Sequence, residues 1–302
     1  METIRRKPRN FKVFEGHAFY TPGFGGVLAL LGFLIVGALF GSLIAMILGL
    51  VYREGFTQEY MMLVSYPLLF VPPLMYVGYK SRSNAVFETG YALDNRHFGK
   101  PGPWGCALMA AAAVLAGAFM TDFLNAQMPP MPAWLEDALG SMTHGTVWIN
   151  FLLVSIFAPV LEEWLCRGMV LRGLLNAKKE DGSRRCSPAC AIMVSALFFA
   201  LIHGNPWQAI PAFTMGCLFG YIYYRTGSLK LTMLMHFVNN TFALICSHID
   251  ALSDMETWLD VLPPKQYWVL FAACALLLVL ILRAFTRIPV QSPAGNCDPV
   301  TE

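Results

Sequence analysis

The feature that most constrains this chain is the length of its apolar stretches. Several of them reach the roughly 20 residues that a helix needs to cross a bilayer. Hydrophobic residues make up 56% of the 302 residues and charged residues only 13%, which excludes a soluble globular domain. The sequence therefore predicts an all-α, polytopic membrane helix bundle of about eight transmembrane helices, at 25–51, 60–79, 104–125, 147–176, 189–203, 208–224, 231–248 and 266–284.

Two of these stretches, 189–203 and 208–224, are short, and Gly204, Asn205 and Pro206 separate them. Glycine, asparagine and proline in succession are typical of a turn. We expect this pair to form a hairpin that need not cross the whole membrane.

Basic residues indicate the orientation, because they accumulate in cytoplasmic loops. They precede the first stretch, follow the second, fourth and sixth, and end the last one. The loops 126–146 and 249–265 instead carry acidic residues, with Lys265 as their only base. Both termini are therefore predicted to be cytoplasmic, in a multi-pass protein of a bacterial or archaeal cell membrane. The basic residues lie beside span ends and form no clustered face for nucleic acid, so no nucleic-acid partner is expected.

The chain divides into four segments by its polar content. Residues 1–24 form a basic, aromatic lead expected on the cytoplasmic surface, and 25–146 form scaffold helices with little chemistry. Polar residues inside apolar stretches concentrate in 147–248, the candidate functional core, and 249–302 hold the last helix and a cytoplasmic tail. Within the scaffold, small residues predict a close helix contact and prolines predict a kinked helix, at Gly37, Gly41, Pro67, Pro72 and Pro73.

Charged residues inside the stretch 147–176 are the first lead to function, since ionisable groups at membrane depth are energetically costly. Glu163 and Arg167 lie one helical turn apart on the same side and can neutralise each other. Glu162 points about 100° away, so it is free to face a cavity and to accept a proton from water. The alternative is structural: the three charges end a span at the interface, where long side chains reach water cheaply.

Two further pairs at spacing i, i+4 lie in other apolar stretches: Phe199 with His203, and His236 with Asn240. Each alone has an ordinary structural interpretation, as a histidine bonded to a carbonyl group or as polar side chains that link helices. Together with the charged residues, they give one membrane core a base, an ion pair, two imidazoles and an amide. Peptide-bond hydrolysis needs such a set, because water must be activated and an oxyanion stabilised.

The motifs Glu-Glu-x-x-x-Arg, Phe-x-x-x-His and His-x-x-x-Asn follow one another in this order and match without departure. In this pattern the chain resembles the CAAX protease and bacteriocin-processing family, also called the Abi family, of intramembrane proteases. The resemblance covers 147–248 and implies that this segment is the catalytic core, with the active site in a cavity among helices four to seven. It implies an endopeptidase that acts in the lipid bilayer on a membrane-associated peptide or protein, either CAAX-like or a peptide precursor.

The family pattern also implies a role for each motif residue. Glu162 would activate water with the assistance of His203. His236 and Asn240 would hold the developing oxyanion. The ion pair of Glu163 with Arg167 would support the site.

The sequence leaves open whether a metal takes part. Two histidines and a glutamate could form an open zinc site, and members of this family are often described as metalloproteases. The chain has no His-Glu-x-x-His motif, however, and Asn240 is an unusual zinc ligand but a good amide donor. We favour metal-independent activation of water, with zinc as the alternative and no other cofactor expected.

Two other functions use the same residue types. A non-catalytic membrane partner, or a bacteriocin-immunity protein of the same fold, would not depend on Glu162. A transporter also uses buried charges and broken helices, but it predicts inverted repeats, and none is evident in the sequence. Within the protease hypothesis, a bacterial source would favour secreted precursors, signalling peptides or bacteriocins as substrates over prenylated proteins.

Overall fold

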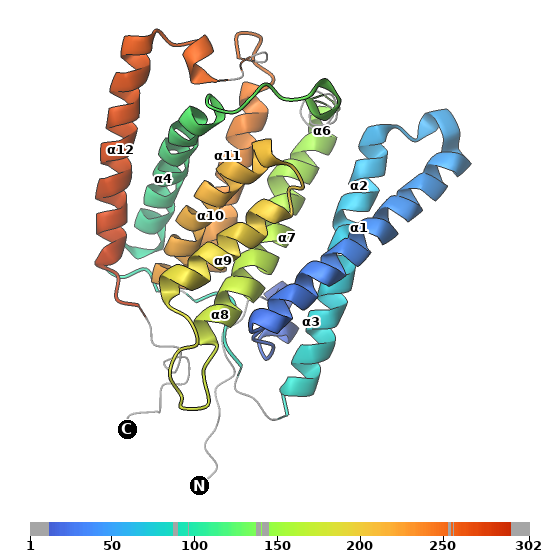
Figure 1. Cartoon of the computed structure of the whole chain (residues 1–302), viewed down its shortest axis with the longest axis vertical. Helices are drawn as coiled ribbons and strands as arrows, with labels where there is room; N and C mark the ends of the chain where they lie inside the picture. The colour runs from blue at the N-terminus through green and yellow to red at the C-terminus, as the bar shows by residue number, and fades with distance from the viewer. Residues whose placement is uncertain are drawn as a thin grey trace.

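The computed structural model describes residues 12–290 except 87–89, 96, 137–139, 141–144, 253–254 and 256, and within this part it is a bundle of helices without a β-sheet. The predicted all-α membrane architecture is confirmed. Six helices of the described part are long and apolar enough to cross a membrane (Figure 1): α1 (Phe24–Tyr52), α2 and α3 together (Gln58–Asn84), α4 (Gly102–Asn125), α6 to α8 (Val147–Asn176), α11 (Leu229–Cys246) and α12 (Pro264–Thr286).

The sequence predicts eight spans, and the described part of the chain has six helices that meet the length and apolar character of a span. The two predicted spans that do not are the helices α9 (Pro188–Leu201) and α10 (Pro206–Thr226). With 14 residues, α9 is about 21 Å long, which is less than the hydrocarbon core of a bilayer. The helix α10 is longer but carries too many polar residues to qualify as a span. The predicted turn between them is present: Gly204 has φ +69°, and the Asn205 side chain accepts a hydrogen bond from the Gln208 amide at the start of α10.

The helix over Val147–Asn176 lies at the centre of the bundle. Its most apolar window is 61% buried, compared with 11% for α12 at the edge. It consists of α6 (Val147–Asn150), α7 (Ala158–Glu163) and α8 (Arg172–Asn176), joined by two π-helical stretches, η3 (Phe151–Phe157) and η4 (Trp164–Leu171). Pro159 has no amide hydrogen to donate to the preceding turn, which fits the wider turns before it. The predicted long helix is thus confirmed, with Glu162 near its middle.

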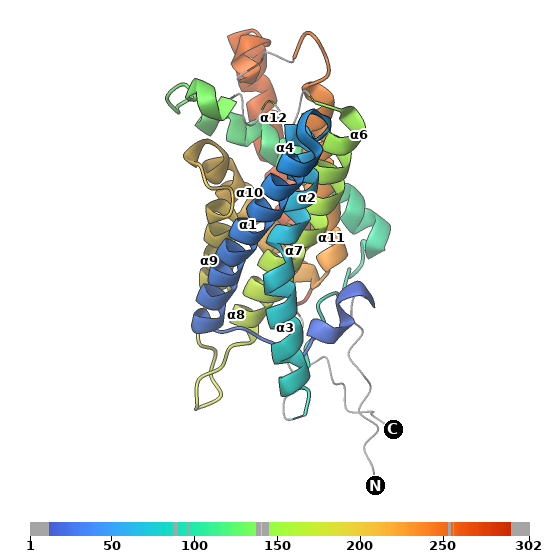
Figure 2. The same ribbon diagram turned by 90° about the vertical axis from the view of Figure 1, so that its right-hand side faces the viewer.

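The helices α1, α2 (Gln58–Leu69) and α3 (Val71–Asn84) form a hairpin at one side of the bundle, which faces the viewer in Figure 2. The predicted small-residue contact is present, because a Cβ atom at Gly37 would collide with the Leu69 carbonyl oxygen and one at Gly41 would lie 2.7 Å from that of Ser65. The predicted kink separates α2 from α3 at Phe70. It follows Pro67, which lacks an amide hydrogen for the helix.

The N-terminal lead packs into the protein more deeply than predicted. Its short helix η1 (Lys12–His17) and the residues after it bury Phe14, Ala18 and Tyr20 in the same apolar cluster as Trp164 of the central helix. Burial of these aromatic and small side chains removes apolar surface from water, so the lead does not merely lie on a surface. Residues 1–11 and 291–302, which include the rest of the predicted lead and the predicted cytoplasmic tail, lie outside the described residues.

Candidate active site

The ion pair of Glu163 and Arg167 lies in the interior of the bundle with both side chains fully buried. Nη1 of Arg167 donates to Oε1 of Glu163 at 2.8 Å, and Nη2 donates to the Gly216 carbonyl oxygen at 3.0 Å. The guanidinium also stacks against the rings of Phe199 and Phe219, at 4.6 and 5.2 Å from their centroids. The predicted pair is therefore present. Its two charges compensate each other in an interior where water does not solvate them.

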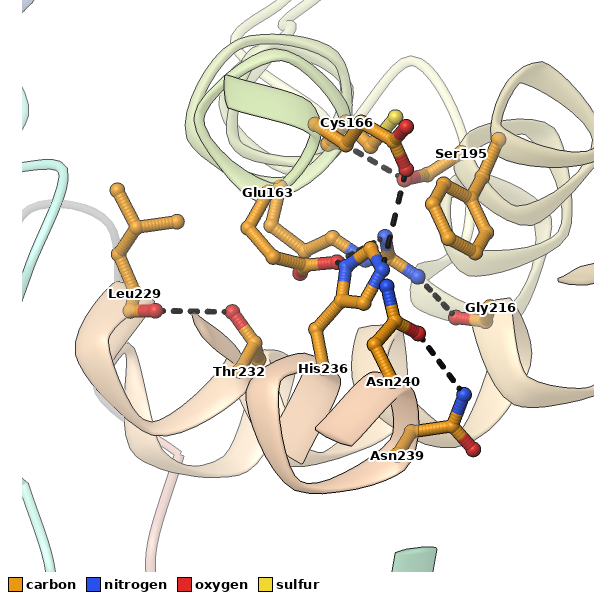
Figure 3. Close-up of polar contacts among 12 residues, drawn as sticks. Glu163, Cys166, Ser195, Gly216, Leu229, Thr232, His236, Asn239 and Asn240 are labelled. Atoms are coloured by element: carbon orange, nitrogen blue, oxygen red, sulfur yellow. Dashed lines mark hydrogen bonds and ion pairs between the residues drawn. The ribbon is translucent and has the colours of Figure 1, made fainter. Parts of the chain in front are cut away.

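His236 extends from α11 toward the same carboxylate, as Figure 3 shows. Its Nδ1 atom lies 3.1 Å from Oε1 of Glu163. An ionised carboxylate only accepts hydrogen bonds, so Nδ1 carries the hydrogen and donates it. The rings of Phe199 and Phe219 pack against the imidazole, with centroids 5.5 and 5.8 Å away. These contacts fix the orientation of the ring and direct Nε2 away from Glu163.

Glu162 lies on the other side of His236. Its side chain is buried, and Oε2 lies 3.9 Å from Nε2 of His236. Oε2 has no hydrogen-bond partner among the described residues. As predicted, Arg167 pairs with Glu163 and not with Glu162. The Glu162 carboxylate is nevertheless held in place, because its Oε1 atom accepts a hydrogen bond from the Tyr66 hydroxyl.

Tyr66 is the site residue that the sequence analysis missed. It lies on α2, within the segment predicted to be scaffold, and is 96 positions from Glu162. A tyrosine in an apolar helix is ordinarily read as an interfacial anchor, so its type gave no signal. The adjacent Pro67 predicted the kink but not the contact.

Asn240, one turn after His236 on α11, is held by two hydrogen bonds. Its Nδ2 donates to the Val154 carbonyl oxygen at 2.8 Å, and its Oδ1 accepts from Asn239 at 3.1 Å. In a π-helical turn, the Val154 carbonyl oxygen would accept a hydrogen bond from the amide of residue 159, five positions later. Residue 159 is a proline and has no amide hydrogen, so this carbonyl oxygen can accept from Asn240. One of the two amide hydrogens of Asn240 is therefore used by the central helix, which leaves the other for a ligand.

His203 forms no hydrogen bond or ion pair with the other predicted site residues within the described part of the chain. It lies beyond the last residue of α9, not within the helix as predicted, because the helix already ends at Leu201 before the Gly204 turn. Its Nδ1 atom is 2.7 Å from the Phe199 carbonyl oxygen. The Phe199 ring packs edge-on against both His203 and His236, and no ion pair among the described residues joins His203 to Glu162.

The charge of the cluster depends on one proton. With both glutamates ionised, Arg167 positive and His236 neutral, the buried group has a net charge of −1. A proton on Nε2 of His236 would bring the net charge of this cluster to zero. An imidazolium at this position donates to Glu163 through Nδ1 and presents a second N–H group beside Oε2 of Glu162.

The donor set does not fit a metal ion in this arrangement. Among the described residues, no group of three histidine, cysteine, aspartate or glutamate side chains is placed to hold one. Glu162 and His236 alone would offer two ligands, and a catalytic zinc site needs three. No chemical step is therefore derived through a metal.

The fold and this cluster together define a class: a polytopic helical membrane protein with a carboxylate, an imidazole and an amide buried in its core. Residues 144–242 match the family model described as "Type II CAAX prenyl endopeptidase Rce1-like". The segment also resembles the "Membrane-embedded CAAX protease MroQ" of Staphylococcus aureus (strain USA300), with 38% identity over 98 residues. That alignment covers 32% of this chain and 38% of the relative. No solved structure shows a significant match to the chain.

The resemblance to the CAAX protease and bacteriocin-processing family that the three motifs predicted is confirmed for the matched segment. It contains Glu162, Glu163, Arg167, His203, His236 and Asn240, so every motif residue lies inside the matched region.

Proposed function

We propose that this protein is an intramembrane endopeptidase that hydrolyses a peptide bond of a membrane-associated peptide or protein. The observation that carries the proposal is the pair of atoms Oε2 of Glu162 and Nε2 of His236, 3.9 Å apart. A water molecule about 2.8 Å from each atom can bridge them. The match of the surrounding segment to a CAAX endopeptidase model supports peptide hydrolysis as the reaction.

In the proposed reaction, Glu162 is the general base. Oε2 takes a proton from the water, and the water oxygen attacks the carbonyl carbon of the scissile bond. The Tyr66 hydroxyl, bonded to Oε1, holds the carboxylate so that Oε2 stays directed at the water. When the carbon–nitrogen bond breaks, Glu162 returns the proton to the leaving amine.

The oxyanion is stabilised by His236 and Asn240. The Nε2–H group of a protonated His236 and the unused amide hydrogen of Asn240 donate to it, because both belong to one face of α11. Glu163 and Arg167 touch no reacting atom and act as positioning residues, since Glu163 fixes the His236 ring through Nδ1. His203 assists from the turn after α9, where its Nε2 atom can orient the attacking water while Nδ1 is held by Phe199.

The proposed substrates are CAAX-like proteins or peptide precursors that reach the site from the bilayer. The name of the Staphylococcus aureus relative refers to a CAAX protease. Zinc-dependent chemistry is the alternative mechanism, and it is tested with the purified enzyme: activity that persists in strong chelators contradicts it, and activity lost to chelators and restored by zinc supports it.

The proposed function is tested by comparing peptides in membranes that contain the wild-type protein, Glu162→Gln or the matched control Glu180→Gln. Glu180 is an exposed residue of the loop between α8 and α9, so the control makes the same chemical change away from the site. Mass spectrometry should show a substrate that accumulates uncut only with Glu162→Gln. Full biological activity of Glu162→Gln would instead support a non-catalytic membrane partner or immunity protein.

A further inference from the structure

A cavity at the end of the bundle where α8 and α10 end is lined by an unusual set of charges. Three arginines line it, Arg172, Arg184 and Arg225, and none of its described lining residues is an aspartate or a glutamate. Its volume of about 90 Å³ exceeds the about 10 to 15 Å³ that one water molecule requires. The cavity therefore has room for a compact anion and offers it only positive charge.

Arg172 forms a positive wall of this cavity, and no ion pair among the described residues compensates its charge. The side chain is 3% exposed. Within the described part of the chain, its guanidinium donates to backbone oxygens and to one methionine sulfur, the oxygens being those of His17, Ala18, Tyr20, Tyr91 and Gly168. Carbonyl dipoles satisfy its hydrogen bonds, but they do not cancel a full charge as a carboxylate does.

Arg184 and Arg225 bring two more positive charges to the cavity. Arg184 is exposed on a tight loop, which is held by the backbone hydrogen bonds from Lys179 to Ser183 and from Arg185 to Ala177. Arg225 donates through Nε and Nη2 to carbonyl oxygens at the end of α12, including Phe285 at 3.1 Å, which leaves Nη1 available. Neither arginine forms an ion pair with the described residues. Three like charges around one cavity repel one another until an anion enters.

The cavity is distinct from the candidate active site. Arg172 follows Glu162 by ten residues on the same helix, a distance of roughly 15 Å along the axis. None of the seven motif residues lines the cavity. An anion bound there does not contact the atoms proposed to cleave the peptide bond.

We propose that this cavity binds a phosphate group, supplied by the headgroup of an anionic phospholipid. Membrane helices end at the level of the headgroups. The N–H groups of Arg172 already donate to protein oxygens, so this residue supplies positive charge to the cavity. The guanidinium of Arg184 and Nη1 of Arg225 are the groups left to donate to phosphate oxygens. Free inorganic phosphate has the same binding chemistry, so the two sources are distinguished experimentally. The site holds the loop between α8 and α9 and the end of α12 against the same headgroup.

The test is native mass spectrometry of the purified full-length protein in mixed micelles that contain phosphatidylglycerol, phosphatidylcholine or inorganic phosphate alone. We expect phosphatidylglycerol to bind in preference to phosphatidylcholine, with a stoichiometry that saturates. Arg184→Gln removes one surface charge and should weaken binding about fivefold. The matched control Arg185→Gln removes the neighbouring arginine, which does not line the cavity, and should bind as the wild type does.

Because Arg184 is exposed, its variant should remain folded, and circular dichroism in lipid-free detergent verifies this. Binding of inorganic phosphate that also weakens in Arg184→Gln would support the phosphate site but assign it to the free ion. Equal binding of phosphatidylcholine, or equal loss in Arg184→Gln and Arg185→Gln, would overturn the proposal. The experiment measures lipid binding and not proteolysis. A negative binding result therefore does not contradict the proposed protease function, and absence of protease activity does not contradict this binding site.

Discussion

Two buried arginines, Arg167 and Arg172, lie five residues apart on the central helix, and their surroundings differ in one respect. Arg167 forms an ion pair with the Glu163 carboxylate, whereas Arg172 is surrounded by backbone carbonyl oxygens. Both have hydrogen-bond partners, but among the described residues only Arg167 forms an ion pair. The charge of Arg167 is therefore balanced by its carboxylate, whereas the positive charge of Arg172 acts on its neighbours.

The largest expected effect tests the charge compensation of Arg167. Arg167→Met removes the guanidinium partner of the buried Glu163 carboxylate and leaves it with His236 alone, which should cost about 3 to 5 kcal/mol of unfolding free energy. The measurement is reversible unfolding in mixed detergent micelles, followed by circular dichroism. The double variant Glu163→Gln, Arg167→Met removes both charges and should recover part of the loss. A double variant less stable than Arg167→Met would contradict this account.

The equivalent change at Arg172 should have a smaller effect. Arg172→Met removes a positive charge that has no carboxylate partner and leaves carbonyl groups of the N-terminal lead and of Tyr91 without a donor. We expect a loss of about 1 to 3 kcal/mol in the same unfolding measurement. Proteolytic activity per folded molecule should be retained, because the residue is remote from Glu162. A loss equal to that of Arg167→Met would remove the distinction between the two regions.

A third change tests the region around Arg167 through activity. Tyr66→Phe removes the hydroxyl that donates to Glu162 and should lower kcat about tenfold with little change in KM, the equivalent of one hydrogen bond to a charged group. The control is Tyr76→Phe on α3, whose hydroxyl bonds to Tyr20 outside the site. If both variants had wild-type kcat, Tyr66 would not position the carboxylate.

The sequence predicted contacts within one helix better than contacts between helices. The pair of Glu163 and Arg167 follows from a spacing of four residues on a helix, and the turn at Gly204 follows from residue type. The contact of Tyr66 with Glu162 depends on how α2 packs beside the central helix, and no local pattern records that. The placement of His203 within a helix was wrong for a different reason, because α9 ends at Leu201, two residues before it.

Arg172 is a second example of surroundings that the sequence does not predict. It was not singled out from the sequence. The structure buries it against the N-terminal lead, where five carbonyl oxygens from separate segments converge. Convergence of this kind requires the tertiary fold, since backbone oxygens have no signature in the sequence.

The smallest expected effect is the share of a pH dependence that the positive charge of Arg172 causes. Burial, and then the positive charge of Arg172, lower the pKa of His17 from its ordinary value of 6.5 to about 4. The folded protein therefore favours neutral His17, whose Nδ1 accepts a hydrogen bond from Trp164. Its contribution to stability is complete above pH 6.5 and is lost as the pH falls from 6.5 toward 4, because the unfolded chain binds the proton first.

We would measure the free energy of unfolding of the wild type and of His17→Gln at several pH values between about 4 and 6.5. Glutamine can accept the Trp164 hydrogen bond but does not titrate, so the comparison isolates the contribution of the His17 proton. As the pH falls, the free energy of unfolding of the wild type should decrease relative to that of His17→Gln. In an Arg172→Met background the same difference should shrink, because the repelling charge is gone while the burial remains. An unchanged difference would mean that burial alone sets the pKa of His17 and that the charge of Arg172 is compensated after all.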